Sequence, residues 1–184
     1  AESGASNPDE LIEKMGEAGV YGGTVISVRP TESYGHFKLD YKERMKNVLS
    51  WVKGYEDRLF PVLWIHPREE NAVEKVRDAA ESGIAAFKMI CDNYNVYDDI
   101  SMRLIEEIAK TGKPLLFHSG ILWIGNAVAA EYNRPANWEH MLKVPKLRFS
   151  LAHCSWPWYD ECIALFGRMN AARRFDPEHM PEMY

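Results

Sequence analysis

The sequence is poor in cysteine and in long apolar runs, and each shortage excludes a class of protein. Three cysteines in 184 residues are too few and too scattered for a disulfide framework or a CxxC metal site. No run approaches the roughly 20 apolar residues that span a bilayer, so we expect no membrane partner. We therefore expect a globular protein of a reducing, cytoplasmic compartment.

Excess positive charge is also absent. The chain has 22 Lys and Arg against 27 Asp and Glu, which gives a formal charge of −5. This balance argues against nucleic acid as a partner and leaves a small-molecule substrate as the expectation, with a homo-oligomer possible. Apolar residues make up 46% of the chain, enough for one sizeable core. We expect a single α/β domain over residues 1–184, and an incomplete one, since the first residue is not Met.

Hairpin signals are almost missing, and apolar β-type runs alternate with helical patterns instead. The runs cover residues 23–29, 60–66, 84–90, 113–118 and 147–153. Such alternation predicts parallel strands joined by crossover helices. About 31 residues separate the middles of successive runs, which is the share of one unit in an eight-unit barrel of roughly 250 residues.

Two architectures fit this pattern, an open doubly wound sheet and a (β/α) barrel. At about 31 residues per unit, 184 residues hold about six units, so an open sheet fits the length more comfortably. However, the chain has neither GxGxxG nor GxxxxGK[ST], the usual nucleotide-binding fingerprints of open sheets. A flavodoxin-like sheet that binds a phosphate-bearing ligand is disfavoured for the same reason.

Polar side chains stand where four of the five runs end. His66, His118 and His153 close the second, fourth and fifth runs, and Lys88 lies near the end of the third. The carboxyl ends of parallel strands form the open face on which catalytic groups sit. Lys88 is either a salt-bridged lysine or a group that binds an anion.

Period-two alternation tests whether the histidines share a face. If His118 points inward, Leu116 does too, and if His153 points inward, so do Leu151 and Phe149. Two such imidazoles could hold one metal, or one could bind it while the other activates a metal-bound water. Alternatively, each is a hydrogen-bonded structural residue.

Several stretches, in their order and spacing, resemble the amidohydrolase-related family of metal-dependent TIM-barrel proteins. They are residues 113–120 (KPLLFHSG), 133–136 (NRPA), 144–157 (VPKLRFSLAHCSWP), 83–88 (GIAAFK) and 10–20 (ELIEKMGEAGV). This family includes hydrolases and carboxymuconate-semialdehyde-type decarboxylases. The resemblance implies a partial TIM barrel that holds about strands two to six of eight.

The resemblance also implies roles for particular residues. His118 would be a metal ligand, and His153 would be a second ligand or the residue that activates water. Lys88 would lie at the pocket and contact a substrate carboxylate. We expect three further residues to bind substrate: His66, Arg134 and Trp156.

The chain departs from the family in its ligand set. The family's first strand carries a His-x-His pair and its eighth strand an aspartate, and neither can be matched here. A catalytic zinc generally needs three protein ligands, so either the chain is part of a longer protein or the barrel has lost its metal.

We therefore expect a metal-dependent hydrolase, in which zinc or manganese activates a water that attacks a carbonyl-type carbon. The alternatives are a decarboxylase with the same pocket and a non-catalytic α/β scaffold without a metal site.

Overall fold

The computed structural model describes residues 4–30, 40–123 and 128–184, and these form a six-stranded parallel sheet in the order β1-β2-β3-β4-β5-β6. The strands are β1 (Gly23–Ile26), β2 (Leu59–Trp64), β3 (Ala86–Met89), β4 (Leu115–Phe117), β5 (Arg148–Leu151) and β6 (Glu182–Met183). Every neighbouring pair is parallel. Sequential order with parallel pairing is the topology of a β/α barrel rather than of a doubly wound sheet.

In the described part of the chain, one α-helix precedes the first strand, and four others connect strands. They are α1 (Pro8–Glu17), α2 (Tyr41–Val52), α3 (Ala72–Glu81), α4 (Asp99–Lys110) and α5 (Tyr159–Phe175). The connection from β4 to β5 differs, because it carries the 3-10 helices η1 (Glu131–Asn133) and η2 (Pro135–Lys143) in place of an α-helix. A further short 3-10 segment, η3 (Ala152–Ser155), follows β5. No helix of the described residues is long and apolar enough to cross a bilayer.

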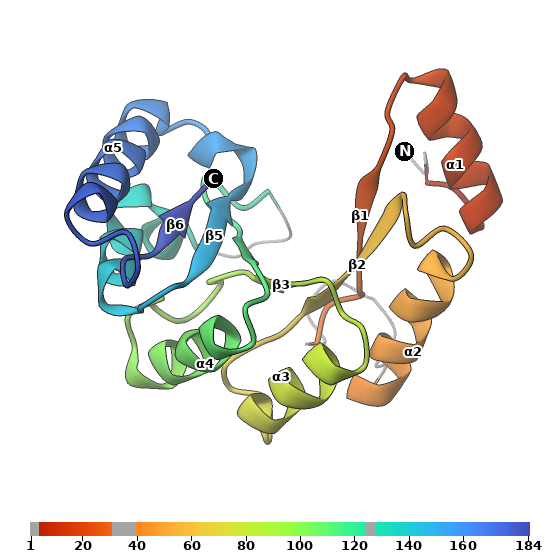
Figure 1. Ribbon diagram of the computed structural model, residues 1–184, viewed down its shortest axis with the longest axis horizontal. Helices are drawn as coiled ribbons and strands as arrows, with labels where there is room; N and C mark the ends of the chain where they lie inside the picture. Colours follow the sequence, from red (N-terminus) through yellow and green to blue (C-terminus); the bar gives the residue numbers. More distant parts are fainter. Residues whose placement is uncertain (1–3, 31–39, 124–127) are drawn as a thin grey trace.

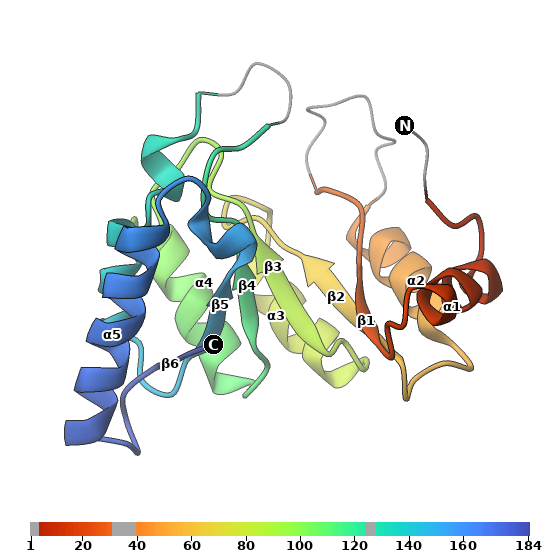
Figure 2. The same cartoon turned by 90° about the horizontal axis from the view of Figure 1, so that it is seen from above.

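The sheet curls like a barrel wall but does not close. Figure 1 shows β1 with α1 on one side of a wide opening and β6 with α5 on the other. Figure 2 shows the helices along the outside of the curved sheet. The fold is therefore a partial TIM barrel, as the sequence predicted, and the short sixth strand adds one to the five expected runs.

Register divides the sheet into two faces. Leu63, Phe87, Leu115 and Phe149 are paired across four strands, and all four are fully buried. They belong to the main core between sheet and helices, together with residues of α3, α4, η2 and α5. The next row across the sheet, Trp64, Lys88 and Leu116, faces the hollow of the barrel.

Candidate active site

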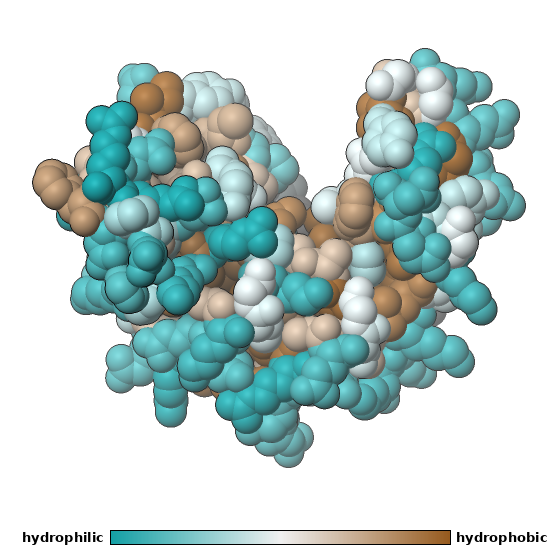
Figure 3. Space-filling model, in the orientation of Figure 1, coloured by the Kyte–Doolittle hydropathy of each residue, from teal (hydrophilic) through white to brown (hydrophobic). Residues whose placement is uncertain are grey.

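A cavity of about 750 Å³ opens at the inner face of the sheet, at the carboxyl ends of the strands. Figure 3 shows the hollow between the two arms of the open barrel. Of the residues that line this cavity, the polar ones besides tryptophan are Ser27, Lys88, His118 and His153. No aspartate or glutamate belongs to the described lining. The described part of the site thus combines a cation and two imidazoles with apolar walls, without an acidic side chain.

Lys88 lies in the row of β3 that faces the cavity. The sheet register pairs it with Trp64 on β2 and Leu116 on β4, and all three line the cavity. Lys88 is only 6% exposed, and burial lowers the pKa of its ammonium to about 8. At neutral pH most Lys88 side chains are still charged, but a minor fraction is the neutral amine.

His118 directly follows β4 and lies two residues after Leu116, so strand alternation brings both to the cavity. Its backbone N–H donates to the Met89 carbonyl at 2.9 Å, which extends the sheet by one rung. The ring is buried, and burial, reinforced by the nearby charges of Lys88 and His153, lowers the His118 pKa to about 4. The His118 Nε2 atom is buried and has no hydrogen-bond partner among the described residues. His118 is therefore a neutral imidazole with one nitrogen left free for a ligand.

His153 reaches the cavity by a different route from the one that alternation predicted. Phe149 and Leu151 are in register with Leu115 and Phe117, on the face that packs against the helices. The prediction that they point inward with His153 is therefore wrong. After β5 the chain turns through three consecutive residues with left-handed φ, His153 at 63°, Cys154 at 47° and Ser155 at 59°. This turn, rather than strand alternation, brings His153 to the cavity.

The two imidazoles meet at the cavity. Their ring centroids are 5.1 Å apart, and the ring planes cross at 62° in an edge-to-face arrangement. His118 is buried, whereas His153 is exposed. A buried neutral ring beside an exposed one suits a division of roles, in which one imidazole orients a ligand and the other exchanges protons with water.

A buried hydrogen-bond network fixes the segments that carry these rings. The Ser119 hydroxyl donates to the Ser155 Oγ at 2.8 Å, which links the residues that follow each histidine. Asn133 is fully buried, accepts from the Gly120 N–H through its carbonyl, and donates from Nδ2 to the Cys91 carbonyl at 2.6 Å. Sequence reasoning did not single out these serines or Asn133, although Asn133 begins the NRPA stretch that carried part of the resemblance.

Tryptophans form much of the apolar wall. Trp156 lines the cavity, as expected for a substrate-binding residue, and its ring lies 5.4 Å from that of Trp123. Trp64 lies on β2, beside Lys88 in the sheet register. Its backbone N–H donates to the Ser27 hydroxyl at 3.0 Å. Trp64 and Ser27 were missed by sequence reasoning, although inward register with Lys88 could have indicated Trp64.

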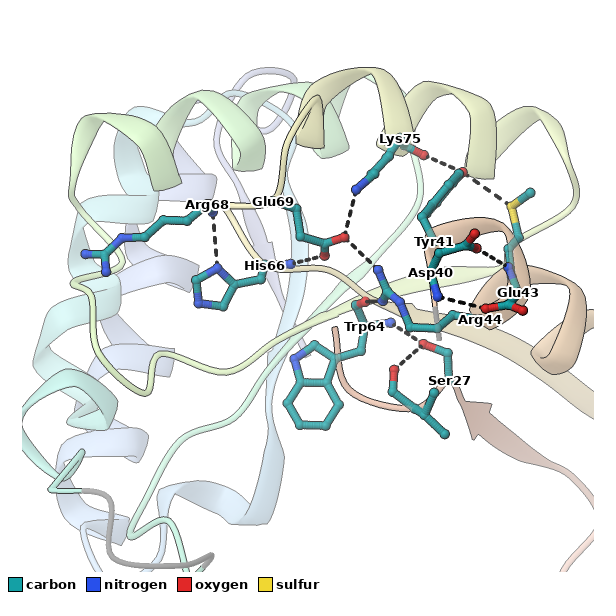
Figure 4. Close-up of polar contacts among 12 residues, drawn as sticks. Ser27, Asp40, Tyr41, Glu43, Arg44, Trp64, His66, Arg68, Glu69 and Lys75 are labelled. Atoms are coloured by element: carbon teal, nitrogen blue, oxygen red, sulfur yellow. Dashed lines mark hydrogen bonds and ion pairs between the residues drawn. The ribbon is translucent and has the colours of Figure 1, made fainter. Parts of the chain in front are cut away.

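His66 does not belong to the cavity lining. Figure 4 shows its ring next to Arg68, whose backbone N–H donates to His66 Nδ1 at 3.1 Å. His66 Nε2 lies 3.6 Å from the Asp92 carboxylate, which in turn pairs with Arg29. Burial lowers the His66 pKa to about 4, so this contact joins a neutral imidazole to the carboxylate and is no salt bridge. The structure therefore places His66 in a buried network behind the site, and its predicted role in substrate binding gains no contact with the cavity.

Arg134 is also absent from the lining. Its guanidinium forms an exposed ion pair with Glu161 on α5 and lies 5.1 Å from the centre of the Trp158 ring. These contacts tie the β4–β5 connection to α5. Its predicted role in substrate binding stays a prediction without support from this geometry.

The residues do not by themselves fit the metal that the resemblance implies. The free Nε2 of His118 is a suitable donor, and His153 lies beside it. Within the described part of the chain, however, no three His, Cys, Asp or Glu side chains come close enough to hold a metal ion. Two imidazoles are one ligand fewer than a catalytic zinc generally uses.

Comparisons with known proteins support the fold. No protein-family model matches the chain, and no curated protein matches it by sequence. Among solved structures, it is similar to a probable 2-pyrone-4,6-dicarboxylic acid hydrolase from Acinetobacter baumannii with citric acid bound. That match has a TM-score of 0.55 at 10% identity and covers 90% of this chain and 59% of the other.

A second similar structure is dihydrodipicolinate synthase from Agrobacterium tumefaciens. Its TM-score is 0.52 at 16% identity, over 96% of this chain and 56% of the other. The chain thus spans less than two thirds of the length of either structure. At these identities the likeness concerns the fold.

Proposed function

We propose that the chain carries the catalytic cavity of a hydrolase that acts on a small carboxylate-bearing carbonyl compound, such as a lactone or an ester. The observation that carries this proposal is the polar set of the cavity: among the described residues it has one lysine without an ion pair and two adjoining imidazoles, and no acidic side chain. An anionic substrate would supply the missing negative charge. The similar hydrolase from Acinetobacter baumannii, which has citric acid bound, supports the same class of ligand.

Each residue has a role in this proposal that follows from its surroundings. The Lys88 ammonium pairs with the substrate carboxylate, because the described cavity lining offers it no carboxylate. His153 is exposed at the cavity and takes a proton from the attacking water. His118 stays neutral through the physiological pH range and orients the water or the carbonyl oxygen through its free Nε2.

Trp64 and Trp156 would contact the body of the substrate with their rings. Because the indole rings are apolar, they also limit the water in the cavity to what the polar groups hold. A divalent metal, zinc or manganese, stays a prediction of the resemblance, with His118 and His153 as its two candidate ligands, and no step above depends on it.

Turnover tests this proposal. The protein that contains this chain is assayed with carboxylate-bearing lactones and esters, including 2-pyrone-4,6-dicarboxylate, by following ring opening or acid release. We expect His153→Gln to lower kcat by roughly 100-fold or more, as for loss of a general base, and Lys88→Met mainly to raise KM. His179→Gln is the matched control, since His179 is exposed and pairs with Asp176.

Three results would count against the hydrolase. Unchanged turnover in His153→Gln would remove the proposed base. Release of CO2 without hydrolysis would favour the decarboxylase, and no turnover of any carbonyl substrate would leave the non-catalytic scaffold.

A further inference from the structure

Among the lysines that the structure describes, Lys88 is unusual because it is buried and pairs with no described carboxylate. Lys14, Lys42, Lys75 and Lys110 all form ion pairs with carboxylates near the surface. Lys88 forms no ion pair with any described residue, and it is only 6% exposed. A buried ammonium without a partner is unfavourable, because burial removes its hydration and nothing replaces it.

The side chains next to Lys88 are mostly apolar. Its neighbours in the sheet register are Trp64 and Leu116, and Ile90 follows on the same strand side. Lys88 itself lines the cavity, so its buried side chain lies between these apolar neighbours and the cavity.

We propose that Lys88 is an imine-forming lysine, whose Nζ condenses with the carbonyl carbon of an aldehyde or a ketone held in the cavity. This activity goes beyond the proposed hydrolysis, since it uses the neutral amine as a nucleophile rather than the ammonium as an anchor. A desolvated lysine in an apolar pocket is one of the recognised ways to obtain an amine nucleophile near neutral pH.

The step balances with groups that line the cavity. The Nζ lone pair attacks the carbonyl carbon, the C=O π electrons move to oxygen, and one proton passes from nitrogen to that oxygen to give a carbinolamine. A second proton reaches the hydroxyl, the C–O bond breaks, and one water leaves as the C=N bond forms. His153 lines the same cavity and can carry both protons between nitrogen and oxygen.

Burial increases the fraction of Lys88 that is present as the free amine. Burial lowers the Lys88 pKa to about 8 from the usual 10.5, so near neutral pH a far larger fraction of this side chain is the free amine. The cavity of about 750 Å³ and its tryptophan walls suit a carbonyl compound with an aromatic or other apolar body.

Reductive trapping tests the proposal. The whole protein is incubated at pH 7.5 with benzaldehyde and sodium cyanoborohydride, and the benzylated lysines are identified by peptide mass mapping at early times. We expect Lys88 to be labelled at least tenfold faster than any other lysine. Lys88→Arg, which keeps the charge without the condensing amine, should lose this fast site, whereas Lys113→Arg, at the opposite end of β4, should keep it.

Labelling that is spread over exposed lysines, with Lys88 no faster than their mean, would overturn the proposal. The wild-type map alone decides this, so a variant that fails to fold does not obscure the result. Trapping also separates the two proposals, because hydrolysis can survive or fail independently of the label on Lys88.

Discussion

The His118 ring meets the His153 ring edge to face, with centroids 5.1 Å apart, although the two residues reach this point by unlike backbone paths. His118 is carried by the regular alternation of β4, and His153 by a left-handed turn after β5. Because the two rings lie side by side, both histidines line the same cavity. The first two predictions concern this pair and the backbone that supports it.

Added zinc should bind this pair weakly. Two imidazoles offer one ligand fewer than a catalytic zinc site generally has, so we expect saturable but weak binding by isothermal titration calorimetry. Removing one of two ligands should weaken it further, and we expect at least a tenfold loss of affinity in His118→Ala. His179→Ala should behave like the wild type, because His179 is exposed and pairs with Asp176. Equal affinity in His118→Ala would exclude this residue as a ligand.

Gly120→Ala should destabilise the protein by roughly 2–4 kcal/mol, from strain and overpacking together. Gly120 has a φ of +107°, and a Cβ there would lie 2.3 Å from the Trp156 carbonyl oxygen. The control is Gly16→Ala in α1, where a Cβ meets nothing within 4 Å. That change should stabilise the helix by about 0.5–1 kcal/mol. Urea denaturation measures both, and a neutral Gly120→Ala would contradict the close approach of these loops.

Arg44→Met should cost about 3 kcal/mol of unfolding free energy, because it removes one partner of a buried charge pair. Arg44 is 1% exposed, and it donates to the Trp64 carbonyl at 2.6 Å and to Glu69 at 2.6 Å (Figure 4). Lys110→Met is the matched control, since Lys110 is largely exposed in its pair with Glu107, and we expect it to cost under about 1 kcal/mol. Similar losses in the two variants would show that the buried pair is no stronger than a surface pair.

Acid should weaken the fold through His66. Burial lowers the His66 pKa from 6.5 to about 4, so the unfolded chain binds a proton at higher pH than the folded chain does. The contribution is fully present above pH 6.5 and is lost as the pH falls toward 4. It amounts to about 3 kcal/mol, since one pKa unit corresponds to about 1.4 kcal/mol. Chemical denaturation at pH 7 and pH 5 should show a smaller loss in His66→Gln than in the wild type. An equal loss would place the acid-sensitive group elsewhere.

The sequence was sufficient for the first five strands because each is a run rich in apolar residues between turn signals, whereas β6 is a two-residue strand without such a run. Alternation also placed Leu116 and His118 on one face correctly, since β4 stays regular up to Phe117. Lys88 followed in the same way, as the sheet register puts it beside Leu116.

The β5 register was beyond the sequence for a physical reason. Left-handed φ values at His153, Cys154 and Ser155 change the direction of the chain. None of these residue types indicates that conformation in a sequence as glycine does. The buried link between Ser119 and Ser155 supports the turn, and it joins residues 36 apart.

His66 and Arg134 lie outside the cavity lining, so their predicted roles in substrate binding stay predictions. The His66 ring accepts a hydrogen bond from the Arg68 N–H and lies 3.6 Å from Asp92, and Arg134 pairs with Glu161, which is distant in the sequence. A residue type at a strand end or in a loop does not reveal which distant carboxylate will engage it. The sequence could therefore indicate at which end of the sheet the polar side chains lie. It could not indicate which of them form contacts outside the cavity.

The most direct test of the central claim, that Lys88, His118 and His153 act from one cavity, is a histidine NMR titration with benzoate. In protein labelled with ¹³C at histidine Cε1, we expect the His118 and His153 signals to shift together and saturably while His179 stays unmoved. Lys88→Met should weaken the binding at least tenfold. A shift of only one of the two rings, or equal binding by Lys88→Met, would contradict the claim.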